Sequence, residues 1–134
     1  MPFTKANMSV LADRIFEECR NLLAAGQMEY AQGDENALDN FERQAKALGL
    51  SREHVLLVYL NKHMDGISSW ARGHQSQRED VTGRINDAIT YLCLLRGMIE
   101  DSRAIPPGSF VPVPSGVVYD GNGNPVTIKR RNDK

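Results

Sequence analysis

Apolar residues recur at every third or fourth position in several segments of the first 103 residues, and this spacing limits the possible folds more than any other feature. It matches the 3.6-residue turn of an α-helix and so predicts amphipathic helices. Four such segments can be distinguished, at about 9–25, 35–48, 52–70 and 80–101. We therefore expect an all-α domain, a bundle of about four helices.

Each predicted helix carries one stripe of apolar residues that should face the core. In the third segment Val55 and Val58 lie opposite the stripe, so two faces of that helix are expected to be covered. The stripes are Met8, Leu11, Ile15, Cys19 and Leu22 in the first segment; Leu38, Phe41, Ala45 and Leu48 in the second; Leu56, Tyr59, Leu60, Ile67 and Trp70 in the third; and Val81, Ile85, Ala88, Leu92, Leu95 and Ile99 in the fourth.

Capping residues mark the expected helix ends. Gly26 follows the first stripe as a residue that can end a helix in the left-handed conformation. Asp34 is placed to cap the second helix, which should close at Gly49 and Leu50 with a Schellman motif. Ser51 comes next and can cap the third helix at once.

The composition changes after Arg103, which suggests a helical domain at 1–103 and a distinct segment at 104–134. Dense prolines in IPPGSFVPVPSG predict an extended connector close to polyproline II. VVYDGNGNPVTIK reads as two short β runs around a Gly/Asn turn, which predicts a β-hairpin. A charged tail, KRRNDK, closes the chain. A lone hairpin is marginal in water, so it should rest on the helices or on a second subunit, and we expect a homo-oligomer.

Charge and composition exclude several classes of protein. Sixteen basic against seventeen acidic residues leave a net charge of −1, so a nucleic-acid partner is not expected. No apolar run approaches the roughly 20 residues of a membrane span, and no signal peptide is evident. The two cysteines, Cys19 and Cys93, fall within helical patterns and suit a reducing compartment. We expect a cytoplasmic protein without a membrane partner.

His63 is the first polar group that a plain bundle would not need. It lies within the apolar stripe of the third helix, where an imidazole can act as a base or donate to an acidic ligand group. The simpler interpretation, a core histidine with one satisfied hydrogen bond, stays open.

Asp87 and Glu18 are the other two candidates. Asp87 follows Arg84 by three residues and has apolar neighbours, and a buried carboxylate needs a partner. That partner is either Arg84 or Lys62 in a structural ion pair, or a metal or ligand. Glu18 flanks the stripe of the first helix, where it either points along a groove or is simply solvated.

Common catalytic signatures are absent from the sequence. It contains no GxxxxGK[ST] loop, no GxGxxG, no HExxH, no GxSxG and no CxxC pair. His54, His63 and His74 are too scattered for their spacing to indicate zinc, so no metal ligand is predicted from spacing.

The stretch from about residue 18 to 100 resembles small phage and prophage proteins grouped as nucleotide-modification-associated domains. In these proteins one segment containing Lys, Tyr and Gly precedes a helix, and a late helix carries a D-x-x-x-Y-like pattern that ends in leucines. The matching elements here are Glu29-Tyr30, Gly33, Asn40-Phe41, Lys62-His63, Arg84, Asp87 and Tyr91.

A more distant similarity is to the MazG-like all-α nucleoside triphosphate pyrophosphohydrolases. Those enzymes hold Mg²⁺ with an E-x-x-E pair on one helix and an E-x-x-D pair on a later one, because Mg²⁺ takes hard oxygen ligands. This chain has Glu17-Glu18 without a second acid three residues on, and Arg84-x-x-Asp87 in place of Glu-x-x-Asp. An arginine there removes a metal ligand and favours direct capture of phosphate.

The resemblance implies a phage-type protein, in the cytoplasm of a bacterial host, that binds a nucleotide or nucleotide-like phosphate ligand. In this interpretation Lys62 and Arg84 meet phosphate, Tyr30 or Tyr91 stacks on the base, and His63 orients the site with Asp87.

If the protein is an enzyme, the implied reaction is phosphoanhydride cleavage with Glu18 and Asp87 on Mg²⁺; the cofactor otherwise stays unknown. The alternative function comes from another class: a non-enzymatic module that binds a host or phage protein through its apolar third helix and its tail.

Overall fold

The computed structural model describes residues 1–30, 36–75, 79–103, 118–119 and 125–126, and its side-chain detail covers 1–26, 36–75 and 79–103. The chain divides into two units, Met1–Arg103 and Ala104–Lys134. The described part of the first unit holds four helices: α1 (Lys5–Tyr30), α2 (Asp39–Leu48), α3 (Arg52–Ala71) and α4 (Val81–Ser102). The expected helical class is thereby confirmed.

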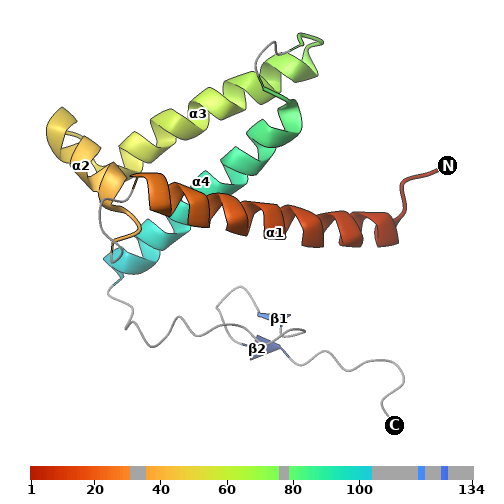
Figure 1. Cartoon of the computed structure of the whole chain (residues 1–134), viewed down its shortest axis with the longest axis horizontal. Helices are drawn as coiled ribbons and strands as arrows, with labels where there is room; N and C mark the ends of the chain where they lie inside the picture. The colour runs from red at the N-terminus through yellow and green to blue at the C-terminus, as the bar shows by residue number, and fades with distance from the viewer. Residues whose placement is uncertain (31–35, 76–78, 104–117, 120–124, 127–134) are drawn as a thin grey trace. The chain divides into compact units, whose positions relative to one another are not determined.

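The pair α3 and α4 is the centre of the helical unit, because these two helices share the most extensive contact. The chain reverses between them, so they run side by side in opposite directions (Figure 1). The short helix α2 packs on α3, and α1 lies across α4 (Figure 1).

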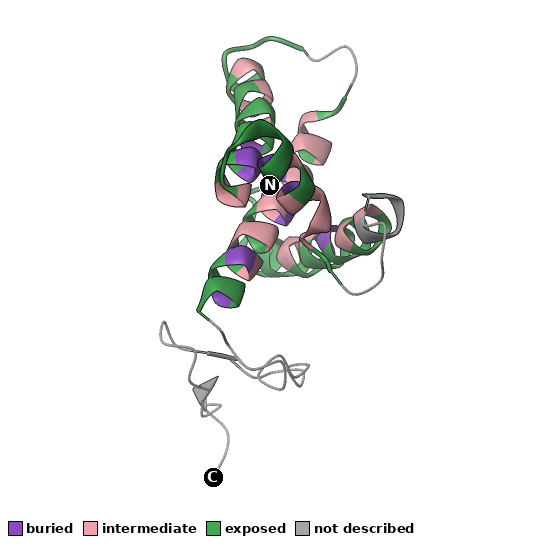
Figure 2. Ribbon diagram, turned by 90° about the vertical axis from the view of Figure 1, so that its left-hand side faces the viewer, coloured by how far each residue is buried: buried purple, intermediate pink, exposed green. Residues whose placement is uncertain are grey.

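The core lies where α2, α3 and α4 meet. Buried residues of the helical unit are coloured purple in Figure 2. Leu56 of α3 and Met98 of α4 are fully buried there, and partly buried side chains of α2 and α4 close over them. The buried set is Phe41, Ala45, Val55, Leu56 and Met98, packed against Leu38, Tyr91, Leu94 and Leu95.

The predicted core stripe of α4 is confirmed only in part, because Ala88 is buried and Leu95 packs against the core, whereas other members of the stripe are not buried. Ile85, Leu92 and Ile99, which the periodicity assigned to the core, are exposed. The face toward α3 instead carries Tyr91 and Met98, together with Asp87 and Leu94. The helix has two apolar stripes, and contact with α3 buries the one that also contains a carboxylate.

The stripe of α1 is also less buried than its periodicity suggests. Cys19 is buried, and its thiol donates to the carbonyl oxygen of Asn86 on α4, with sulfur and oxygen 3.7 Å apart. Met8 and Leu22 remain exposed because α1 meets the other helices along only part of its length.

Several predicted helix ends are confirmed. Gly49 ends α2 in the left-handed conformation, with φ of 68°, and the amide of Leu50 donates to the carbonyl of Ala45. The Ser51 side chain accepts from the amide of His54 and so caps α3. The predicted start of α4 near residue 80 is also correct, since the Asp80 side chain accepts from the amide of Thr82.

The ends of α1 and the start of α2 differ from prediction. Thr4 and Asn7 cap each other's backbone amides, so α1 begins at Lys5 and not at Ser9. Its helix continues through Gly26 to Tyr30. Asp34 lies outside the described residues, and α2 begins later than expected, after a turn in which Asn36 accepts from the amide of Leu38.

Arg52 joins three helices near the first turn of α3. Its guanidinium donates to Glu42 of α2 and to Asp101 of α4, each at 2.9 Å. It also donates to the carbonyl oxygen of Met98 at 3.1 Å and to the hydroxyl of Ser102 at 3.2 Å. Only 16% of the Arg52 side chain is exposed, so this cluster fixes the end of the bundle where the core lies.

In the second unit the structure describes two short strands. They are β1 (Val118–Tyr119) and β2 (Pro125–Val126), which pair antiparallel with Val118 opposite Val126. The polyproline connector, the turn of the expected hairpin and the charged tail lie outside the described residues.

Candidate functional site

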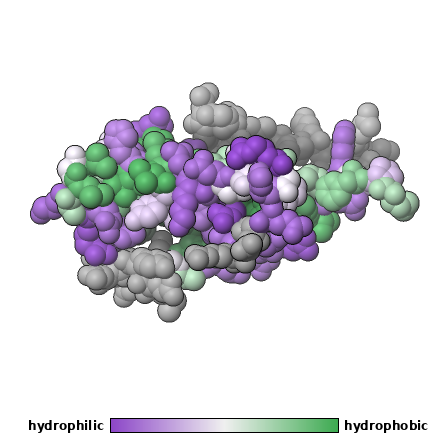
Figure 3. Space-filling model, turned by 90° about the horizontal axis from the view of Figure 1, so that it is seen from above, coloured by the Kyte–Doolittle hydropathy of each residue, from purple (hydrophilic) through white to green (hydrophobic). Residues whose placement is uncertain are grey.

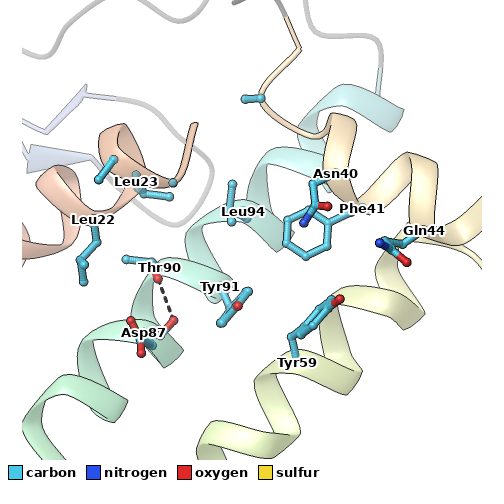
Figure 4. A pocket seen from close by; sticks show the side chains of 13 residues that line it. Leu22, Leu23, Asn40, Phe41, Gln44, Tyr59, Asp87, Thr90, Tyr91 and Leu94 are labelled. Carbon is cyan, nitrogen blue, oxygen red and sulfur yellow. Dashed lines mark hydrogen bonds between the residues drawn. The ribbon is translucent and has the colours of Figure 1, made fainter. Parts of the chain in front are cut away.

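A cavity of about 600 Å³ opens between the four helices, next to the core. Helix α1 supplies apolar walls, α2 supplies two amides and a phenylalanine, and α3 and α4 supply tyrosines (Figure 4). The lining residues are Leu22, Leu23, Ala25, Gly26, Ala37, Asn40, Phe41, Gln44, Tyr59, Asp87, Thr90, Tyr91 and Leu94.

Three aromatic rings form one wall of the cavity. Tyr59 of α3 and Tyr91 of α4 are nearly parallel, with 6° between their planes and 6.2 Å between ring centroids. Phe41 of α2 meets both rings edge-on, at 6.1 and 6.2 Å. The edge-to-face contacts hold the two tyrosines in place, so their orientation does not depend on a ligand.

Polar groups stand at opposite sides of this wall. Asn40 and Gln44 lie one turn apart on α2 and carry amide groups at one side of the cavity (Figure 4). Asp87 and Thr90 lie at the other side, on α4, where the Thr90 hydroxyl donates to the Asp87 carbonyl oxygen at 2.7 Å. The cavity therefore combines flat apolar surface with hydrogen-bonding groups at its two ends.

Asp87 also faces a histidine and a second acid. Its Oδ2 lies 3.7 Å from Nδ1 of His63, too far for a hydrogen bond, and this buried nitrogen has no hydrogen-bond partner among the residues that the structure describes. Ligand atoms of His63, Glu79 and Asp87 all lie within 4.8 Å of one another. Burial raises the pKa of the Asp87 carboxyl most, and the nearby Glu79 carboxyl raises it further, whereas His63 and Arg84 act in the opposite direction.

Arg84 reaches this cluster by passing over Gly66 of α3. A Cβ at position 66 would lie 2.4 Å from Nη1 of Arg84, so only glycine leaves room for the guanidinium as it stands. The close approach of α3 and α4 thus sets the position of a positive charge beside the Asp87 carboxylate.

Four of the seven predicted site residues come together, namely His63, Arg84, Asp87 and Tyr91, and of these Asp87 and Tyr91 line the cavity while His63 and Arg84 lie beside it. Glu18 is exposed on α1 and accepts a 2.7 Å hydrogen bond from the Asn86 side chain, beside the cluster and outside the cavity lining. Lys62 is exposed on α3 and does not line the cavity either. The side chain of Tyr30 lies outside the described part of α1.

No family model, curated protein or solved structure matches this chain. The resemblance to nucleotide-modification-associated domains and to MazG-like enzymes therefore stays a prediction, and the function has to be argued from the cavity itself.

Reasoning from the sequence missed several contributors to the site, Gln44 and Thr90 among them. Phe41 and Tyr59 were assigned to the core stripes, and periodicity does not distinguish an aromatic ring in a core from one that lines a cavity. Glu79 precedes the N-cap of α4, so it lies just outside the segment whose helical spacing could have pointed to it.

Proposed function

We propose that this chain binds a nucleotide or a nucleotide-like ligand in the cavity between its helices. The observation that carries the proposal is the wall of Phe41, Tyr59 and Tyr91, with side-chain amides at one end and a carboxylate at the other. A volume of about 600 Å³ falls in the range of small-molecule sites in proteins.

The aromatic wall suits a planar, partly polar ring. Tyr59 is 38% exposed, so a base can reach its face without the core opening. Stacking on an aromatic side chain contributes about 1–3 kcal/mol per base. Asn40 and Gln44 can each pair with a base edge through two hydrogen bonds, as these amides do with adenine.

Arg84 lies near Asp87 and outside the cavity lining, so its positive charge can meet a phosphate group that extends from the cavity past Asp87. Arg84 presents a planar group that binds phosphate through two parallel hydrogen bonds. Lys62 is exposed one residue before His63, where it can contribute attraction at longer range.

Binding without turnover accounts for the arrangement better than hydrolysis does. A pyrophosphohydrolase would need Glu18 and Asp87 on one Mg²⁺, and the Glu18 carboxylate is already bonded to Asn86. If hydrolysis occurs all the same, pyrophosphate release that requires Mg²⁺ will reveal it.

A thermal shift screen with standard, modified and cyclic nucleotides tests the proposal, because a ligand of the folded state raises Tm by mass action. We expect a shift with at least one nucleotide, also in the presence of a chelator. Replacing Tyr59 by Leu should weaken that binding by about 1–3 kcal/mol. Val58→Ala, on the exposed side of the same helix, is the matched control and should bind normally. No shift with any nucleotide would sink the proposal.

A second function, the binding of a partner protein, is favoured by a separate observation. Helix α3 leaves large apolar side chains exposed. On the face of the molecule seen in Figure 3, hydrophobic patches alternate with hydrophilic ones. Val58 is 64% exposed and Trp70 is 54% exposed, and Leu57 and Met64 are exposed as well. A protein partner that raises Tm where no nucleotide does would favour this function.

We also propose that the chain forms a homo-oligomer through the exposed apolar residues of α4. Ile85, Leu92 and Ile99 are exposed and follow one another at seven-residue intervals, whereas Ala88 and Leu95 between them belong to the core of the same chain. A seven-residue repeat of apolar side chains places them along one side of a helix, as in the contact line of a coiled coil. We assign the same stripe of a second copy as its cover, since two-fold dimers use one patch on both subunits.

No helix in the described part of the chain is long and apolar enough to cross a membrane.

A further inference from the structure

We infer that His63, Glu79 and Asp87 form a binding site for a divalent metal ion of the Zn²⁺ or Mn²⁺ class. This site is separate from the nucleotide cavity, although Asp87 borders both, and it does not depend on the function proposed above. The three residues come from α3, from α4 and from the position just before the N-cap of α4, so only the folded chain assembles them.

The distances fit a metal centre. One ligand atom from each residue lies within 4.8 Å of the other two. Ligands at about 2.0–2.2 Å from an ion are at most about 4.4 Å apart, so a small side-chain rotation closes the site. The His63–Asp87 separation of 3.7 Å already lies within that limit.

The cluster is incomplete as a purely structural network. Buried polar atoms in folded proteins nearly always have a hydrogen-bond partner, and Nδ1 of His63 has none. The Asp87 carboxyl that faces this nitrogen stays beyond hydrogen-bond range of it and instead shares a hydrogen bond with a second acid, Glu79. A cation between the three groups would bond the free nitrogen and neutralise two adjacent carboxylates at once.

The mixture of ligands selects the kind of ion. Mg²⁺ prefers oxygen ligands only, whereas imidazole nitrogen combined with carboxylate suits Zn²⁺, Mn²⁺ and their neighbours. Three protein ligands leave at least one coordination position open. Arg84, held over Gly66 beside Asp87, favours an anionic oxygen in that position.

Titration of the full chain with Zn²⁺, Mn²⁺ or Mg²⁺ alone tests the site, with Co²⁺ as a spectroscopic probe. We expect one Zn²⁺ per chain, bound at least about tenfold more tightly than Mg²⁺, and visible Co²⁺ absorption bands. His63→Gln should lower Zn²⁺ affinity by about tenfold or more. His74→Gln is the matched control, because His74 is exposed and outside the cluster, and it should bind Zn²⁺ as the unmodified chain does.

Equal Zn²⁺ affinity in the His63→Gln and His74→Gln variants would overturn the site, as would a preference for Mg²⁺ over Zn²⁺. Circular dichroism checks that each variant is folded. If His63→Gln fails to fold, Glu79→Gln replaces it, since Glu79 is exposed and lies outside the core. No nucleotide is present in the titration, and the nucleotide screen includes a chelator, so either proposal can fail while the other stands.

Discussion

Asp87 is a residue whose ionisation should cost stability. Burial, followed by the Glu79 carboxyl, raises its pKa above the ordinary aspartate value of about 4, against the opposing charges of His63 and Arg84. A carboxyl with a raised pKa in the folded state stabilises fully below its unfolded pKa. That contribution is lost as pH rises through the folded pKa.

Asp87→Asn should therefore raise Tm at pH 7 and flatten the fall in stability from pH 4 upward. The expected change is about 1 kcal/mol, which corresponds to roughly 4–8 °C in a domain of this size. Urea unfolding at several pH values, with a chelator present, measures the change in the free energy of unfolding. Asp65→Asn, on the exposed face of α3, is the control. A less stable Asp87→Asn variant at pH 7 would mean that the carboxylate is favourably paired.

Comparing Gly66→Ala with Gly97→Ala separates the effect of the contact between α3 and Arg84 on stability from the general effect of Gly→Ala in a helix. Gly→Ala inside a helix normally stabilises by about 1 kcal/mol. Gly97→Ala should show this gain, because an added Cβ there meets no atom within 4 Å. Gly66→Ala should lose most of the gain or reverse it, since the new methyl group displaces the Arg84 guanidinium. Urea unfolding measures the free energy of unfolding of both variants. Equal gains would contradict the close contact between Gly66 and the Arg84 guanidinium.

The residues of the site could be predicted only in part. His63 and Asp87 were identified because a polar side chain among apolar helical positions needs a reason to be there. Glu79 could not be found in this way, since it precedes the cap of α4 and helical periodicity does not extend to it. Glu18 and Lys62 looked equivalent to the others along the sequence, and only packing of the helices separates them from the cavity.

At the scale of whole elements, the periodicity of apolar residues predicted that the helices exist, but it did not predict which face of a helix is buried. Helix α4 carries Ile85, Leu92 and Ile99 on one stripe and Tyr91 and Met98 on another. The first stripe is purely apolar, so the pattern favours it as the core. The helix partner decides otherwise, because α3 offers a matching aromatic and histidine face to the second stripe.

Among the polar residues, Arg52 should contribute most to holding α2, α3 and α4 together. Arg52→Ala leaves partners on two other helices without their donor, but those partners are partly exposed. We expect a loss of about 1–3 kcal/mol in the free energy of unfolding. Arg43→Ala removes an exposed ion pair with Asp39 within α2 and should cost less than about 1 kcal/mol. Similar losses in the two variants would show that the cluster does not join the helices.

For the whole molecule, the helical unit leaves much apolar surface uncovered for its size. Exposed large side chains occur on every helix, with Phe16 on α1, Leu48 on α2, Val58 on α3 and Leu92 on α4 among them. Scattered apolar residues are normal on a protein surface, whereas a continuous stripe indicates an interaction site. On α4 the exposed residues Ile85, Leu92 and Ile99 repeat at seven-residue intervals along one side of the helix, which is why the second copy is assigned to them.

Leu92→Lys should convert the oligomer to a monomer. Leu92 is 52% exposed at the middle of a stripe that spans about 21 Å from Ile85 to Ile99, so a charge there enters the centre of the interface. Light scattering after size exclusion measures the mass. Val10→Lys is the control, because Val10 is 71% exposed on α1 and lies off the α4 stripe. We expect it to keep the mass of the unmodified chain. A monomeric unmodified chain, or two variants of equal mass, would rule out this stripe as the interface.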